Sequence, residues 1–159
     1  MDIRNISPQN RQQINYFISS HWVSTNMVVR GKIVDMTILD GVAIYENETI
    51  IGLVTYKING NECEIISLDS LKENQGIGTG LVNKVIEIAT KVKCTKIKLI
   101  TTNDNINAIR FYQKRGFDMV RIYYNALVSA RKIKPSIPMI GEFNIPLKHE
   151  IEFEKNMFN

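Results

Sequence analysis

Residues 73–81 read ENQGIGTGL and place three glycines within five positions, immediately before an apolar helical pattern. Apolar residues recur with helical spacing from Leu81 to Val92, which predicts a helix with a wide buried stripe. Glycine lets a ligand approach the backbone, and the unpaired N–H groups and dipole at a helix start favour an anion. The stretch therefore predicts an anion-binding helix start, or a turn whose glycines serve positive φ and tight packing alone.

The spacing of the glycines separates the known phosphate-binding schemes. A P-loop requires Lys and then Ser or Thr after its last glycine, but Leu81 follows Gly80. A dinucleotide fingerprint requires a third glycine three positions after the second, whereas Gly80 is two positions after Gly78. The next strand, KIKLITT (96–102), ends on threonines instead of an acidic residue. What remains is the bare backbone of the turn, whose geometry suits a diphosphate.

The segments on either side of the glycines alternate like strands. Residues 41–68 read as three successive strands separated by ENE and by Asn59-Gly60, a strong hairpin signal, and so predict an antiparallel meander. KIKLITT follows the predicted helix, so it and the strand before the glycines form a β-α-β crossover with parallel strands.

The N-terminal part of the chain gives a less regular pattern. Residues 2–7 alternate as a short first strand, and Ser7 followed by Pro8 predicts the start of an amphipathic helix that ends near Ser20. Between Ser24 and Asp40 the pattern is unclear. It favours an irregular segment and a second helix equally.

After KIKLITT, the chain predicts one more helix and two more strands. Asp104 or Asn105 caps a helix that runs to about Arg115 and is stopped by Gly116. The predicted strands are FDMVRIYYNAL (117–127) and HEIEFEKN (149–156), with a proline-broken excursion between them. The pattern predicts an α/β (α+β) fold with a mixed central sheet and helices on both faces, in a single domain over residues 1–159.

Composition excludes several classes of protein. The chain is 44% hydrophobic and 23% charged, as in ordinary globular domains, and no apolar run approaches the roughly 20 residues of a membrane span, so we expect a cytoplasmic protein that does not bind membranes. The net charge of +4 comes from basic residues scattered among acidic ones, which argues against nucleic-acid binding. Cys63 and Cys94 lack a CxxC spacing and are expected to be small core residues, and we expect no metal.

Two motifs together resemble the GNAT superfamily of N-acetyltransferases. That family carries Gln/Arg-x-x-Gly-x-Gly/Ala at the loop and Asn-x-x-Ala-x-x-Phe/Leu-Tyr-x-x-x-Gly-Phe about a strand later. The loop here reads Glu73-Asn74-Gln75-Gly76-Ile77-Gly78, and residues 105–117 read NINAIRFYQKRGF. The resemblance covers essentially the whole chain, is sharpest over residues 64–117, and extends to a bacterial subgroup whose substrates are generally unassigned. Glu73 stands where the family has Gln or Arg, and we expect it to face solvent or to pair with a lysine such as Lys72.

The resemblance implies acetyl-coenzyme A (acetyl-CoA) as co-substrate. It places the diphosphate on the N–H groups of Gln75, Gly76, Ile77, Gly78 and Thr79. It also implies that the parallel strands splay apart, with the pantetheine arm paired to the backbone at Leu68 and Ser70 like an added strand. Asn105 and Tyr112 are seven residues apart and share one face of their helix, so both can reach the same ligand.

Acetyl transfer from a thioester to an amine requires an acid and a base. The leaving thiolate has a reference pKa near 8.5, and a phenol can donate a proton to it as it departs. Tyr112 matches the position of this acid in the family, so the resemblance assigns it that catalytic role. The alternative role for Tyr112 is structural, in which the ring packs at a helix edge and the hydroxyl lies in solvent.

An alkyl ammonium has a pKa of about 10 and must lose a proton before it attacks. Strand alternation places Glu64, Ile66 and Leu68 on one face, which makes Glu64 a candidate base or else an ordinary exposed glutamate. Glu150 and Glu152 on the last strand are rivals that could also select a cationic substrate. Of the two histidines, His149 beside Glu150 is the better candidate for contact with the substrate.

Two functions agree with these residues. One is an N-acetyltransferase, an acyltransferase that acts on a primary amine of a small molecule or peptide. The other is a non-catalytic acyl-CoA sensor of the same fold. Residues 24–40 and 132–146 are expected to wall the acceptor cleft, where they would set specificity without a readable code. The sequence agrees with either a monomer or a homodimer.

Overall fold

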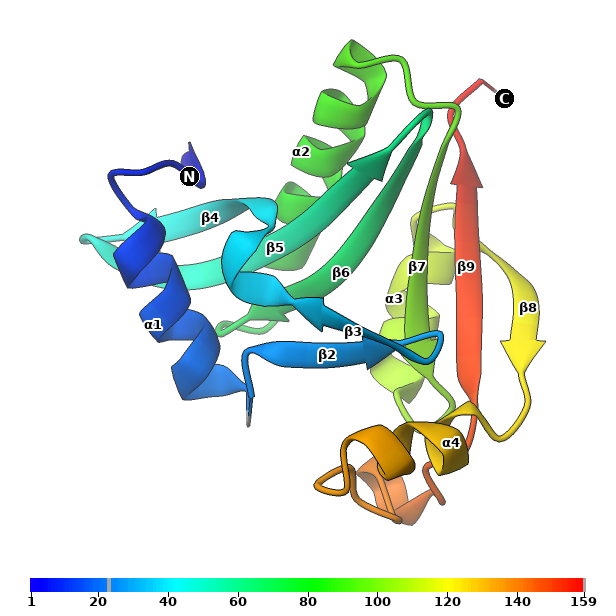
Figure 1. Ribbon diagram of the computed structural model, residues 1–159. Helices are drawn as coiled ribbons and strands as arrows, with labels where there is room; N and C mark the ends of the chain where they lie inside the picture. The colour runs from blue at the N-terminus through cyan, green and yellow to red at the C-terminus, as the bar shows by residue number, and fades with distance from the viewer. Residues whose placement is uncertain (23, 159) are drawn as a thin grey trace.

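The computed structural model describes residues 1–22 and 24–158, and a seven-stranded mixed sheet with the order β1-β4-β5-β6-β7-β9-β8 lies at its centre (Figure 1). The strands are β1 (Asp2–Asn5), β4 (Asp40–Glu46), β5 (Thr49–Asn59), β6 (Glu62–Ser70), β7 (Lys96–Thr102), β8 (Asp118–Tyr123) and β9 (Glu150–Asn156). All neighbours pair antiparallel except β6 and β7. The predicted mixed sheet, with its meander and its parallel crossover, is confirmed.

Helices cover both faces of this sheet (Figure 1). Helix α1 (Arg11–His21) lies on one face together with a two-stranded hairpin of β2 (Asn26–Val29) and β3 (Lys32–Asp35), and we call this side the α1 face. Helices α2 (Ile77–Lys91) and α3 (Ile106–Lys114) lie on the opposite side, the α2 face. A fourth helix and two short 3-10 helices complete the chain as α4 (Ala126–Ile133), η1 (Met36–Ile38) and η2 (Glu142–Asn144). None of the helices in the described residues is long and apolar enough to cross a membrane.

Each face has its own hydrophobic core. On the α2 face, α2 and α3 pack on the sheet through residues such as Leu81 and Tyr112, and Cys63 and Cys94 are buried in the same core as free thiols. Burial raises the pKa of Cys63 to about 12, so its thiol stays protonated and unreactive at neutral pH. On the α1 face, Ile14 and other residues of α1 pack against the sheet and against η1.

Strands β6 and β7 pair along only part of their length. Their parallel register runs from Glu62 opposite Lys96 to Ile65 opposite Leu99, and no pairing follows it in the described residues. Immediately beyond, the register between β5 and β6 shifts and leaves Ile66 as an extra residue. Such a bulge bends its strand, so β6 turns away from β7 at this point and the two strands splay apart.

The bulge also changes which side chains share a face. Ile65 packs into the core of the α2 face, and its neighbour Ile66 packs into the core of the α1 face. Beyond the bulge, Leu68 packs on the α2 face, whereas Glu64 contacts Arg30 of the hairpin on the α1 face. The prediction that Glu64, Ile66 and Leu68 share one face is therefore wrong for Leu68, because an extra residue breaks the two-residue alternation.

The N-terminal predictions need two corrections. Helix α1 begins after Asn10, not at Ser7, because the Asn10 side chain accepts the Ser7 N–H at 2.8 Å and closes a turn before the helix. The unclear segment from 24 to 40 contains the β2–β3 hairpin. Its turn places Arg30 at φ 48° and Gly31 at φ 73°, as a two-residue hairpin turn requires. Arginine at the first turn position concealed this signal.

The strand predicted over 117–127 is too long. Strand β8 ends at Tyr123, and Asn125 at φ 56° turns the chain into α4. Leu127 and Ala130 on α4 are buried against Leu147, so tertiary packing decides that these residues are helical.

Candidate functional site

A cavity of about 1020 Å³ lies where β6 and β7 separate. Its walls are the diverging ends of these two strands, the loop before α2 and the first turn of α2, and one side of α3. Trp22 and Met27 on the α1 face also line it. The cavity therefore passes through the sheet and connects its two faces.

The glycine turn has the geometry of an anion-binding helix start. Gly76 caps α2 at φ 73°, and the first helical hydrogen bond runs from the Gly80 N–H to the Gly76 carbonyl at 2.8 Å. The N–H groups of Ile77, Gly78 and Thr79 come before that bond, so they have no partner within the helix. These residues line the cavity and offer it backbone donors at the positive end of the helix dipole.

The three glycines serve different purposes. Gly76 adopts a positive φ that other residues reach only with strain. A Cβ atom at Gly78 would lie 3.1 Å from the ring of Phe111, so this glycine allows α3 to pack closely against α2. A Cβ at Gly80 would meet its nearest neighbours at 3.5 and 3.6 Å, which is ordinary contact.

Basic side chains surround the cavity beside the glycine turn. Arg115 donates to Thr79 Oγ1 from Nε at 3.1 Å, and its guanidinium lies 3.6 Å from the centroid of the Phe111 ring. Lys72, Arg110 and Lys114 line the same cavity. Arg115 was not among the site residues predicted from the sequence, although its place directly before Gly116 in the second motif was a signal. Positive charge at this end favours an anionic ligand.

Gln75 differs from expectation, and Glu73 follows one of its two expected arrangements. Gln75, predicted among the cofactor contacts, is exposed and does not line the cavity. Glu73 lies at the edge of the cavity and is exposed to solvent, while Lys72 forms its ion pair with Glu46 of β4 and not with Glu73. The sequence could not show the latter because Glu46 is distant in the chain and is brought near by the meander.

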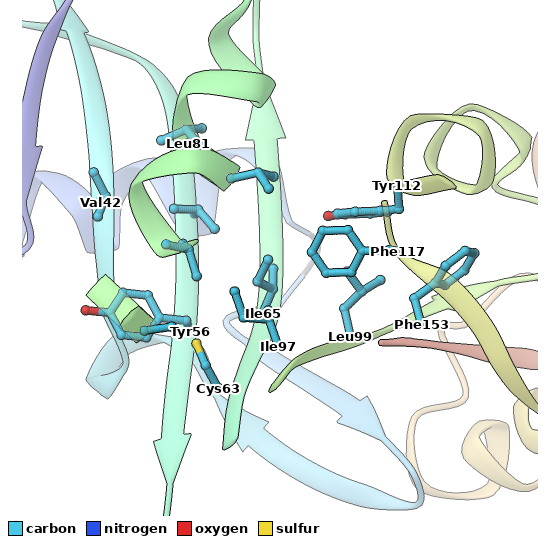
Figure 2. Packing of buried hydrophobic residues seen from close by; sticks show 14 of the residues in the cluster. Val42, Tyr56, Cys63, Ile65, Leu81, Ile97, Leu99, Tyr112, Phe117 and Phe153 are labelled. Atoms are coloured by element: carbon cyan, nitrogen blue, oxygen red, sulfur yellow. The ribbon is translucent and has the colours of Figure 1, made fainter. Parts of the chain in front are cut away.

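Tyr112 lies in an aromatic group between α3 and the sheet (Figure 2). Its ring meets the edges of Phe111 and Phe117 at centroid distances of 5.1 and 5.4 Å, and it is 6.1 Å from Phe153. The hydroxyl points away from Phe153, toward the side on which Ile65 lies. Burial raises the pKa of Tyr112 far above its usual value, so the phenol remains a proton donor throughout the neutral range.

Asn105 starts the helix that carries Tyr112. Its side-chain oxygen accepts the N–H of Ala108 at 3.1 Å, which caps α3 as predicted. Asn105 and Tyr112 both line the cavity. The Asn105 oxygen is committed to the cap, so its side-chain NH₂ is the group left to donate to a ligand.

The three candidate carboxylates form one group on the α1 face, which we call the carboxylate cluster: Glu64, Glu150 and Glu152. Arg30, at the tip of the β2–β3 hairpin, reaches over β7 and donates to Glu64 at 2.5 Å and to Glu152 at 3.4 Å. Its backbone N–H lies 3.4 Å from Glu150 Oε2. Tyr123 donates to Glu152 at 3.1 Å. Arg30 was not among the site residues predicted from the sequence, because nothing in its local pattern reveals a contact with β6 and β9.

Glu150 is the least satisfied member of the cluster. It is 2% exposed, and within the described residues no donor lies within hydrogen-bonding distance of its Oε1 atom. Burial raises the pKa of Glu150, and the nearby Glu64 adds to the rise, while Arg30 opposes it.

His149 does not join the cluster through a side-chain contact. Its Nδ1 accepts the N–H of Asn125 at 2.8 Å, and its ring stacks on Tyr124 at 4.9 Å. The imidazole thus holds the start of α4 against β9.

Replacing Glu150 with glutamine should stabilise the protein at neutral pH. Because the folded pKa of Glu150 is raised, the folded state binds its proton more tightly than the unfolded chain does. The stability that this proton provides is complete below the ordinary pKa of 4.5 and is lost as the pH rises through the folded pKa. Urea unfolding across the pH range should show a smaller decline above pH 4.5 in Glu150→Gln than in the wild type. Equal declines would contradict the burial of an ionisable carboxyl.

Known proteins resemble this chain in sequence and in fold. Residues 18–117 match a family described as the acetyltransferase (GNAT) family. The chain is 47% identical over 146 residues to the uncharacterized protein YdhI of Bacillus subtilis (strain 168), and the match covers 91% of each chain.

Two solved structures share the fold. A Bacillus subtilis acetyltransferase in complex with CoA matches with a TM-score of 0.69 and 16% identity, over 98% of this chain and 97% of that one. A GNAT family acetyltransferase from Elizabethkingia anophelis with acetyl-CoA bound has a TM-score of 0.66 and 20% identity, over 97% and 96%. At these identities the likeness concerns the fold.

Proposed function

The chain belongs to the acetyltransferase (GNAT) family, and we propose that it transfers the acetyl group of acetyl-CoA to a primary amine. The observation that carries the proposal is the cavity through the splayed strands β6 and β7. It joins a helix start suited to a diphosphate, on one face, to the side of the sheet that carries a carboxylate cluster. Two structures of the same fold hold CoA or acetyl-CoA, which supports the cofactor half of the proposal.

Coenzyme A fits the α2 side of this cavity. The backbone N–H groups of 77–79 would hold the diphosphate, with Arg115 nearby to balance its charge. Beyond the bulge, β6 has no ladder with β7, so the backbone at Leu68 and Ser70 is available to the amides of the pantetheine arm. Asn105 would contribute its NH₂ group from the opposite wall.

The reaction begins with an ammonium that must lose a proton before it attacks. We assign Glu64 as the base that accepts this proton, directly or through water. The nitrogen lone pair then attacks the carbonyl carbon of the thioester, a C–N bond forms and the C–S bond breaks. Tyr112 donates its proton to the departing sulfur and regains one from the new amide nitrogen. The balance is one amide, one CoA thiol and one proton released to solvent.

Thiol release from acetyl-CoA tests this function across a panel of polyamines, aminoglycosides, amino acids and peptides with free N-termini. Binding of acetyl-CoA should be measured on the same protein by calorimetry. Binding together with amine-dependent thiol release supports the transferase. Binding without release on any amine would instead identify a sensor, and failure to bind acetyl-CoA would refute both functions.

Exchanging Gly78 for alanine should weaken CoA binding about tenfold. The added Cβ would meet the Phe111 ring at 3.1 Å and would push the first turn of α2 away from α3. Such overpacking costs roughly 1–3 kcal/mol, and about 1.4 kcal/mol lost from binding is a tenfold loss of affinity. Gly80→Ala is the matched control, because it adds the same atom to the same helix at ordinary contact distance. Calorimetric titration with CoA measures both variants. If they bind alike, the close contact at Gly78 does not shape the site.

Glu64→Gln should remove the acidic limb from the pH profile of kcat/KM, because the amide cannot accept the proton of the ammonium. Glu62→Gln is the control: Glu62 lies two residues earlier on β6, and pairs with Lys98 at 2.9 Å instead of with Arg30. Initial rates on one good acceptor, measured at several pH values, provide the profile. A wild-type profile in Glu64→Gln would remove this residue from the reaction.

A further inference from the structure

The carboxylate cluster carries more negative charge than its protein partners neutralise. Glu64, Glu150 and Glu152 supply three carboxyl groups, and within the described residues Arg30 is the cation that forms ion pairs with them. Arg121 bonds the hydroxyl of Tyr123 at 3.3 Å and is exposed to solvent. The site therefore lacks positive charge.

The contacts from Arg30 to the two carboxylates of β9 are long. Arg30 approaches Glu64 to 2.5 Å, but its contacts with Glu152 and Glu150 are both 3.4 Å. Charge-assisted hydrogen bonds normally measure about 2.7–2.9 Å, so Arg30 engages these two carboxylates only weakly. The nearer donor to Glu152 is the uncharged hydroxyl of Tyr123, at 3.1 Å.

The burial of these two carboxylates makes the lack of positive charge costly in free energy. Glu150 and Glu152 are 2% and 5% exposed, and glutamate is almost never buried so completely unless it is paired. Glu150 Oε1 is buried without a donor in the described part of the chain. A ligand that brings positive charge and N–H donors would satisfy this oxygen better than a neutral or an anionic ligand would.

We propose that the acceptor is an aliphatic diamine or polyamine, whose second ammonium binds between Glu150 and Glu152 while the reacting amine lies near Glu64. This inference rests on the proposed acetyl transfer at the same site. The second ammonium keeps its protons and takes no part in the reaction; only the amine near Glu64 forms a bond to the acetyl carbon. A single amine would leave Glu150 Oε1 unpaired.

The sheet sets the spacing between the two charges. Strands β6 and β9 flank β7, so these strands lie about 10 Å apart at the usual strand separation. Glu64 lies opposite Lys98, which in turn lies opposite Glu154, so Glu152 is displaced along β9 by roughly 7 Å from the position that faces Glu64. Glu150 lies roughly 7 Å further along β9. The cavity is lined by Ile100 and Thr102 of β7, which pair with Glu152 and Glu150 in the sheet, so a second ammonium a few methylenes from the reacting nitrogen would lie beside these carboxylates.

Matched amines test this inference. Diaminobutane and butylamine have the same carbon chain and differ in the second amine, and diaminopropane and diaminopentane vary the spacing. The wild type should show kcat/KM at least about tenfold higher for diaminobutane than for butylamine. Glu150→Gln and Glu152→Gln should each lower that ratio about tenfold. Glu154→Gln lies on the same strand and pairs with Lys96, and it should leave the ratio unchanged.

A binding measurement separates this inference from the proposed function. Calorimetric titration of diaminobutane and of butylamine into the CoA-loaded protein measures binding without turnover. The dicationic acceptor is supported if diaminobutane binds more tightly than butylamine and Glu150→Gln abolishes the difference. Equal binding of the two amines overturns the inference. So does a kcat/KM for diaminobutane that equals that for butylamine. In either case, acetylation of butylamine or of a peptide would show that acetyl transfer stands. Thermal unfolding verifies that each variant is folded, and Glu150→Gln should unfold at a higher temperature than the wild type at neutral pH.

Discussion

Replacing Tyr112 with phenylalanine is expected to lower kcat for acetyl transfer about 100-fold, with a much smaller change in the binding of acetyl-CoA. The ring keeps its contacts with Phe111, Phe117 and Phe153, so the fold and the cavity should persist. What is lost is the hydroxyl that we propose as the proton donor to the departing sulfur, and whose pKa burial raises. Steady-state kinetics on a good acceptor, together with CoA titration, separate the two effects.

Tyr16→Phe provides the control for this experiment. Tyr16 is 75% exposed on α1, away from the cavity, so removal of its hydroxyl should change neither kcat nor binding. Loss of activity in Tyr112→Phe alone assigns the effect to the hydroxyl at the site. If Tyr112→Phe retains wild-type kcat, the tyrosine has a packing role and another group protonates the thiolate.

Exchanging Phe153 for alanine should destabilise the protein by about 3–5 kcal/mol, the usual range for removal of a buried phenylalanine side chain. Phe153 is fully buried on β9 between Leu99 and Met119 of the neighbouring strands, and its ring lies beside Tyr112 and Phe117, 6.1 Å from the Tyr112 ring (Figure 2). Urea unfolding should show the loss, and the melting temperature should fall by about 10 °C.

Phe158→Ala is the matched control, because Phe158 is 75% exposed near the end of the chain and should contribute within about 0.5 kcal/mol. Acetyl transfer in Phe153→Ala should also decline at temperatures where the protein is still folded, since Tyr112 loses its support. A loss of stability below about 1 kcal/mol would mean that the core beside the site rearranges to fill the space.

Local sequence signals predicted most of the central sheet. The Asn59-Gly60 turn and the alternation on either side of it describe short-range preferences, and the structure confirms the meander that they indicate. The same holds for Asn105, which caps the start of α3, and for Gly116, which follows its end at φ 84°. The β2–β3 hairpin and α4 were missed, because packing on the sheet and not local preference decides these segments.

The sequence by itself determined the GNAT fold and the glycine turn that starts α2, since glycine spacing and the Asn105 to Phe117 motif lie within single strand-helix units. The carboxylate cluster was decided only by the tertiary structure. Glu64, Glu150 and Arg30 come from separate elements, and no local pattern records that β9 inserts beside β7 or that a hairpin tip crosses above both. A one-residue bulge at Ile66 then assigns Glu64 and Leu68 to opposite faces, because one extra residue inverts the alternation from which faces are predicted.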